Sequence, residues 1–162
     1  MATPTYDLLA STTLATSASS VTFSSIDQSY GDLIVIVNAA GSTTLEARIR
    51  INSDSGSNYN SVRMSGNGSN ATTALLASQT SGFLSVIANA TTGEAILIQV
   101  EIQDYTATDK HTSILARANQ SATGTEATAL RWASTAAVTS TEILTSTGNW
   151  AIGSTFNLYG IA

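Results

Sequence analysis

Cysteine is absent from the 162 residues, and histidine occurs only once, at His111. Without cysteine the chain forms neither disulfide bonds nor thiolate metal sites, so stability has to come from packing, with association between chains as a second source. His111 lies between Lys110 and Thr112 at the predicted start of a strand, where a solvated histidine is the ordinary outcome. No Gly-x-Ser-x-Gly motif is present. We therefore expect no enzymatic activity, no catalytic residue and no cofactor.

Charge is also scarce, and positive charge most of all. Lys and Arg number six, Asp and Glu number eleven, and together they make up 10% of the chain, which leaves a net charge of −5. Soluble domains usually contain about 25% charged residues, so the surface is expected to be mostly neutral and rich in hydroxyl groups. A protein that binds nucleic acid needs a basic surface to neutralise phosphates. The composition therefore predicts no nucleic-acid partner.

Long apolar runs are missing as well, and the first seven residues lack the basic region and apolar core of a secretory signal. A membrane-spanning helix needs about 20 apolar residues. We expect a protein without a membrane partner that is made in a cytoplasm and stays soluble there.

Two patterns invite a ligand. Residues 66–71 match the letters of a dinucleotide-binding fingerprint, but a turn-rich loop follows them instead of a helix, which favours a hairpin. Asn52, Asp54 and Asn58 cluster oxygen atoms in one short loop, as a calcium site does. The loop lacks the further acids of an EF-hand, and Asx-turns with Gly56 at a positive φ explain the same residues. We therefore predict no metal site, although calcium stays open as an alternative.

Strand signals are what the sequence does contain. Leu45, Ala47, Ile49 and Ile51 alternate with polar residues, and residues 95–103 repeat this pattern with every second position apolar. Residues 33–37 are apolar without interruption, which is typical of a strand covered on both faces, the second face by another subunit. Weaker strand signals occur at residues 6–11, 21–24, 61–64, 83–88, 112–118, 127–132, 141–144 and 156–161.

Such spacing of short strands predicts an all-β fold, an antiparallel β-sandwich of a single domain. We expect residues 13–162 to form the sandwich, and residues 1–12 to be an N-terminal arm or its first strand. Residues 71–81 are the exception. Their Ala-Leu-Leu-Ala core favours a short helix, whereas the flanking Thr and Ser favour a loop.

Arginine and aromatic residues in or beside the predicted strands are candidates for a protein interface, because guanidinium and aromatic groups are enriched there. Cross-strand pairing with Glu46, Glu101 or Glu126 explains the arginines equally well. The interface candidates, taken with the N-terminal segment and the loops at residues 52–58 and 65–70, are Tyr6, Leu8, Arg48, Arg50, Asp54, Asn58, Tyr59, Asn67, Arg131 and Trp132.

Four segments together resemble a module of tailed-bacteriophage virion proteins. They are Val-Thr-Phe-Ser-Ser-Ile at 21–26 with Tyr30 and Asp-Leu at 32–33, Arg-Ile-Arg-Ile-Asn-Ser-Asp-Ser-Gly-Ser-Asn-Tyr at 48–59, Trp-Ala-Ser-Thr at 132–135, and Gly-Ser-Thr-Phe-Asn-Leu-Tyr-Gly-Ile at 153–161. The resemblance implies a jelly-roll-like sandwich that commonly trimerises. It also implies a place in capsid decoration (cement) proteins or in tail-fibre and spike appendages, without catalytic residues.

Between these two locations we expect the capsid. The chain shows no elongated shaft and no particle-anchoring domain, and it ends directly after its last predicted strand. The hypothesis is a homotrimeric decoration protein on the capsid surface of a virion, made in the host bacterial cytoplasm and bridging subunits of the major capsid protein. The alternative is a receptor-binding module of the tail that recognises a host surface glycan.

Overall fold

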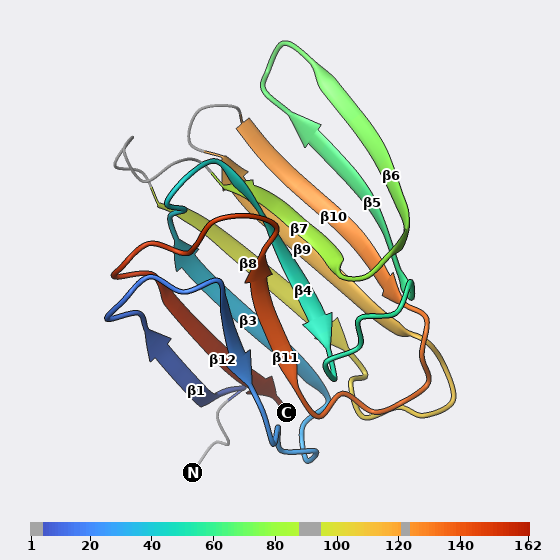
Figure 1. The fold of residues 1–162 in the computed structure, drawn as a ribbon. Helices are drawn as coiled ribbons and strands as arrows, with labels where there is room; N and C mark the ends of the chain where they lie inside the picture. The colour runs from blue at the N-terminus through green and yellow to red at the C-terminus, as the bar shows by residue number, and fades with distance from the viewer. Residues whose placement is uncertain (1–4, 88–94, 121–123) are drawn as a thin grey trace.

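The computed structural model describes residues 5–87, 95–120 and 124–162, and these residues form twelve β-strands and no helix (Figure 1). None of the described segments could therefore cross a membrane as an apolar helix. The strands are β1 (Tyr6–Thr13), β2 (Ser20–Phe23), β3 (Asp32–Ala39), β4 (Leu45–Ile51), β5 (Tyr59–Gly66), β6 (Ala71–Gln79), β7 (Gly82–Ile87), β8 (Ile96–Gln103), β9 (Thr112–Gln120), β10 (Gly124–Trp132), β11 (Thr141–Thr145) and β12 (Thr155–Ile161).

The strands form two antiparallel sheets packed face to face as one sandwich domain. The larger sheet has eight strands in the order β1-β12-β3-β8-β9-β10-β5-β6, and the smaller has four in the order β2-β11-β4-β7. Figure 1 shows the smaller sheet in front of the middle of the larger one, with the β5–β6 hairpin reaching beyond it. The predicted fold class is confirmed. When β5, β6, β9 and β10 are set aside, the larger sheet keeps the order β1-β12-β3-β8 beside β2-β11-β4-β7 of the smaller sheet. This arrangement of two four-stranded sheets is compatible with a jelly roll.

The core lies between the sheets and follows the alternation in the sequence. Leu45, Ala47, Ile49 and Ile51 are buried on β4, and every second residue from Ile96 to Ile102 is buried on β8. Burying one such aliphatic side chain contributes about 1.5–3 kcal/mol, before the entropy lost on folding is subtracted. Trp150 and Phe156 meet edge to face, with ring centroids 5.3 Å apart.

Strand β3 explains the unbroken apolar run at residues 33–37. Leu33, Val35 and Val37 point into the core, while Ile34 and Ile36 lie on the outer face of the larger sheet. Ile34 is nevertheless only 5% exposed. In the described residues no further layer covers this face. The register instead places Ile34 between Tyr159 of β12 and Glu101 of β8, within one sheet.

The expectation of a short helix or a loop at residues 71–81 is wrong, because residues 71–79 form strand β6. Its backbone pairs with β5 from Ala71 opposite Gly66 to Gln79 opposite Tyr59, with an irregularity near the end. Alanine and leucine favour a helix by only about a few tenths of a kcal/mol per residue. Hydrogen bonding to a neighbouring strand outweighs this preference.

The N-terminal segment is the first strand from residue 6 onward, because Tyr6–Thr13 pairs with β12 along its whole length. Leu9 and Ala10 pack against the core, so this part is not a free arm. Pro4 and the residues before it lie outside the described residues.

Candidate interaction surface

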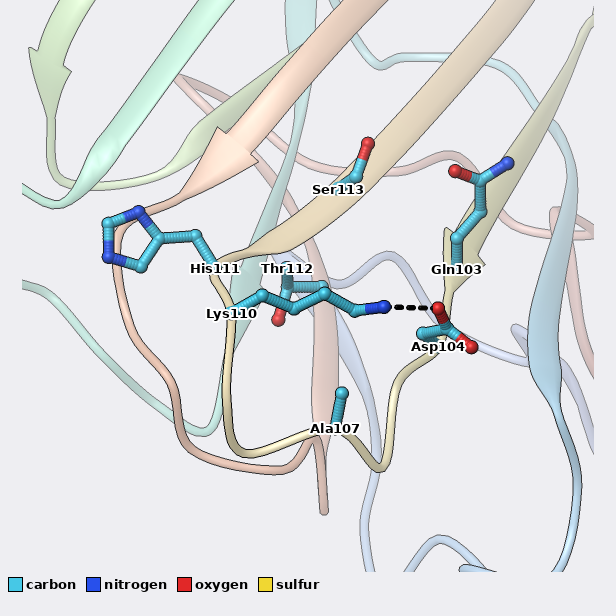
Figure 2. A pocket seen from close by; sticks show the side chains of 7 residues that line it. All are labelled: Gln103, Asp104, Ala107, Lys110, His111, Thr112 and Ser113. Atoms are coloured by element: carbon cyan, nitrogen blue, oxygen red, sulfur yellow. Dashed lines mark hydrogen bonds and ion pairs between the residues drawn. The ribbon is translucent and has the colours of Figure 1, made fainter.

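The hollow around the single histidine lies where the β8–β9 connection returns to the sheet (Figure 2). Lys110 donates to Asp104 across this hollow, and that hydrogen bond raises the pKa of Lys110. His111 is exposed and points away from the pair in Figure 2, while Ser113 stands on β9. The arrangement closes a turn with one exposed ion pair. It does not orient a base toward a nucleophile, as acyl transfer would require.

The loop at residues 52–58 is organised around the carboxylate of Asp54. Oδ1 accepts from the Gly56 amide at 2.8 Å, and Oδ2 accepts from Asn58 Nδ2 at 2.8 Å and from Trp132 Nε1 at 2.7 Å. The Trp132 donor is the main reason that the pKa of Asp54 is lowered. Three N–H donors therefore bond to the two oxygens of this carboxylate, which is the only acidic group of the loop. The described residues hold no group of three or more His, Cys, Asp or Glu side chains placed to bind a metal ion.

Backbone strain in this loop lies elsewhere than the sequence predicted. Gly56 does not have a positive φ. The residues of this loop with a positive φ are Asn52 (50°) and Ser53 (58°). Asn52 tolerates this conformation because its side chain is tied down. It donates to Ala137 O at 2.8 Å and accepts from the amides of Thr139 and Ser140 at 2.8 and 3.0 Å. A Cβ at residue 56 would come within 2.9 Å of Asn58 Nδ2, so a larger residue there would shift this amide and disturb its bond to Asp54.

Tyr59 and Trp132, two of the interface candidates, are core residues. Tyr59 is 0% exposed and Trp132 is 2% exposed. The Tyr59 hydroxyl accepts from the Ile51 amide at 2.9 Å and donates to the Asp54 carbonyl at 3.1 Å. Burial raises the pKa of Tyr59 to about 12. The interface interpretation is corrected for both residues, because their side chains are used within the chain.

Arg48 and Arg50 lie on the outward face of the smaller sheet and form ion pairs there. Arg48 Nη2 is 2.6 Å from Glu46 Oε2 on the same strand, and Arg50 Nη1 is 2.8 Å from Glu142 Oε2 on β11. The first partner was among the predicted ones and the second was not. Such half-exposed pairs contribute about 0–1 kcal/mol each to stability. The two arginines therefore stay at the surface, and their ion pairs do not indicate what that surface binds.

Asn67 shapes the hairpin loop between β5 and β6. Its Oδ1 accepts from the amides of Ser69 and Asn70 at 3.0 and 2.8 Å, and Gly68 beside it has a φ of 86°. This Asx-turn closes the β5–β6 hairpin that the sequence predicts here instead of a dinucleotide-binding loop.

The sequence did not predict where the exposed large apolar side chains gather, which is the outer face of the eight-stranded sheet. Seven of the eight exposed large apolar side chains of the described residues lie there, on strands β1, β5, β6, β8 and β9. They are Tyr6, Leu8, Val62, Met64, Leu75, Leu97 and Leu115. The eighth, Ile152, lies in the β11–β12 connection.

Pairing registers place many of these side chains in one row, because directly opposed residues share a face of the sheet. The row crosses all eight strands and consists of Leu8, Tyr159, Ile34, Glu101, Leu115, Ala129, Val62 and Leu75. Of the sequence-predicted candidates, this face brings together Tyr6 and Leu8, with Arg131 at its edge. Arg131 is exposed and makes no ion pair or hydrogen bond to a described residue.

A short polar ladder runs through the middle of this face. Arg117 donates through Nε and Nη2 to Gln99 Oε1, at 3.2 and 2.5 Å, and Gln99 Nε2 donates to Glu101 Oε1 at 2.9 Å. A shallow groove beside the ladder is lined by Tyr6, Ile34, Ile36, Gln99, Arg117 and Tyr159. An apolar surface with a few fixed polar groups is the composition that protein interfaces have at their centre.

The alternation of residues could have revealed part of this surface. Leu97 and Leu115 occupy outward positions between buried neighbours on β8 and β9, where a polar residue is expected. Comparison with known proteins adds no assignment, since no protein-family model and no curated protein matches the chain.

Proposed function

We propose that the chain is a structural protein of a phage virion, a homotrimeric capsid decoration protein that binds the major capsid protein and catalyses no reaction. The observation that carries the proposal is the outer face of the larger sheet, with seven exposed large apolar side chains on one side of a sandwich. An apolar patch of this kind is typical of a surface that binds other proteins. The segments that resemble virion proteins support the choice of a phage capsid as the binding partner.

The mechanism is mechanical and additive. Each copy lies on the capsid surface and joins neighbouring capsid subunits, and many small interfaces together oppose the pressure of the packaged DNA. A β-sandwich suits this work because its core is formed between two sheets and does not depend on a ligand. The protein is made in the host bacterial cytoplasm, where capsids assemble.

Copy number in purified virions tests the proposal. Quantitative mass spectrometry is expected to find the chain in amounts comparable to the major capsid protein, and purified capsids lacking the chain are expected to bind it. A copy number comparable to that of tail proteins, with no binding to capsids, would contradict a decoration role.

The groove beside the polar ladder favours a second candidate, a tail module that binds a host glycan. Tyr6 and Tyr159 offer aromatic rings and Gln99 and Arg117 offer hydrogen-bond donors, the groups that hold a sugar ring. Binding of the purified chain to host surface polysaccharide, abolished in a Tyr159→Ala variant and retained in an Ile152→Ala control, would favour this candidate. Hydrolysis of the same polysaccharide would contradict both candidates, since neither includes catalysis.

A further inference from the structure

Strand β6 is an uncovered edge of the larger sheet. It is the last strand in the sheet order, and β5 is the only described strand with which it makes extensive contact. Residues 71–75 are all exposed, and Leu75 reaches 70% exposure. Figure 1 shows the β5–β6 hairpin reaching past the smaller sheet, so the rest of the chain does not obstruct this edge. One side of the β6 backbone thus presents its N–H and C=O groups outward.

The other three sheet edges carry features that natural proteins use to prevent pairing with a further strand. Strand β1 contains the charged Asp7 and has a bulge between Leu8 and Ala10. Strand β2 has only four residues. The pairing of β7 with β4 is interrupted by a register shift beside Arg48.

Strand β6 has none of these features along residues 71–76. Its nine residues contain no charge and no proline. The only irregularity is at its end, where the pairing with β5 shifts and Ser78 has a φ of 53°. Long, regular and uncharged edges are the ones that pair with another strand. We infer that β6 is an interaction edge.

We propose that the partner of this edge is β6 of a second copy, paired antiparallel about a twofold axis. The strand is suited to pair with itself, because antiparallel self-pairing along residues 71–76 sets only methyl, hydroxyl and leucine side chains opposite one another and no like charges. Pairing also continues the apolar row, since it sets an outward-facing β6 residue of the second copy beside Leu75, which neighbours Val62. The inference comes from this edge alone and does not depend on a virion role.

Geometry makes the proposal specific. Directly opposed residues of two strands lie on the same face of a sheet, and a twofold axis perpendicular to the sheet exchanges the two strands. One residue of β6 must therefore lie opposite its own copy. The two larger sheets then form one continuous sheet, with their apolar outer faces on the same side.

A cysteine scan tests the pairing. Because the chain has no native cysteine, any disulfide that forms must involve the introduced residue. Thr73→Cys, Ala74→Cys and Leu75→Cys are each exposed to mild oxidation. Ile152→Cys, at a residue that is 70% exposed and lies off the apolar face, is the control. Opposed residues have Cβ atoms about 4.5–5.5 Å apart, close to the range that a disulfide needs. We expect disulfide-linked dimers to form fastest at one of the three positions. Equal rates at all four positions would overturn the proposal.

Charge on the edge gives a second, independent test. With residue 73, 74 or 75 on the axis, Thr73→Lys/Leu75→Lys sets a lysine of one copy opposite a lysine of the other, so light scattering should report half the wild-type mass at high concentration. Ile152→Lys, which adds a charge to an exposed apolar position far from β6 in sequence, should leave the mass unchanged. An unchanged mass in the edge variant would contradict β6 pairing. It would leave the capsid role intact, because that role is tested by copy number and capsid binding.

Discussion

At the scale of single side chains, Asp54 joins its own loop to the end of β10. Its carboxylate accepts from Gly56 and Asn58 within the loop and from Trp132 at the end of β10. A carboxyl whose pKa is lower in the folded chain binds fewer protons there than in the unfolded chain. It therefore stabilises the fold above the ordinary pKa of 3.8 and loses this contribution as the pH falls below it.

Asp54→Asn removes this charge and one acceptor. Hydrogen bonds to charged groups contribute about 1.5–3 kcal/mol, so we expect the variant to lose about 2 kcal/mol of unfolding free energy at neutral pH. The difference from wild type should shrink as the pH drops below about 4, where wild-type Asp54 becomes protonated. Urea unfolding across pH measures this. Asp109→Asn, at an exposed loop residue, is the control, and an equal effect there would contradict the role of Asp54.

Tyr59 couples the end of β4 to the same loop through its buried hydroxyl. Tyr59→Phe leaves the Ile51 amide without its acceptor, so we expect a loss of about 1–3 kcal/mol at neutral pH. The pKa of Tyr59 is raised to about 12, so wild type binds its proton more tightly when folded and loses stability as the pH rises from 10 toward 12. The variant should lose less over this range. Unfolding measured beside a Tyr6→Phe control checks both effects.

At the scale of elements, Glu126 joins three strands across the two sheets. On β10 its side chain is 0% exposed and pairs with Arg63 of β5, whose guanidinium lies 5.3 Å from the ring centroid of Phe83. Glu126 Oε2 also accepts from Ser85 Oγ at 2.8 Å and from the Val86 amide at 3.2 Å, both on β7. The contact fixes β7 over the β5 end of the larger sheet.

Removing one member of a buried ion pair costs about 3–5 kcal/mol, and the 28% exposure of Arg63 places this pair at the lower end of that range. We expect a loss of this size in Glu126→Ala. Glu46→Ala, which breaks the half-exposed pair with Arg48, should cost about 0–1 kcal/mol. The double variant Arg63→Met/Glu126→Leu should recover only part of the loss, because apolar residues of similar size replace both charges but leave Ser85 and the Val86 amide without their acceptor. Chemical unfolding that gives equal costs for Glu126→Ala and Glu46→Ala would contradict this account.

Alternation was sufficient to predict most strands, and its failure at β6 has a physical cause. On β4 and β8 one face is buried, so the sequence alternates, and the predicted inward residues are the buried ones. On β6 neither face is buried apart from partial cover of Leu76 and Gln79, so no period of two is required. The Ala-Leu-Leu-Ala core then matches a helix as well as a strand, and only pairing with β5 decides.

At the scale of the whole molecule, the apolar outer face depends on register, which the sequence does not specify across distant strands. Leu97, Leu115, Val62 and Leu75 come from four strands, and their common face appears only when the sheet is assembled. For Tyr59 and Trp132 the sequence predicted an interface, whereas both side chains are buried in the core. Aromatic residues are enriched both at interfaces and in cores, so residue type alone did not separate the two.

This face gives the prediction that bears most directly on assembly. If it holds the proposed trimer together, Leu97→Lys/Leu115→Lys should dissociate the trimer, and light scattering should report a threefold drop in mass. Each substitution is at a surface position, so the unfolding free energy should change by about 0.5 kcal/mol or less. Ile152→Lys adds a charge at a residue that is 70% exposed but lies off the face, and it should leave the trimer intact. A trimer that survives in the double variant would place the subunit interface elsewhere, and capsid binding by that variant would show whether the face binds the capsid instead.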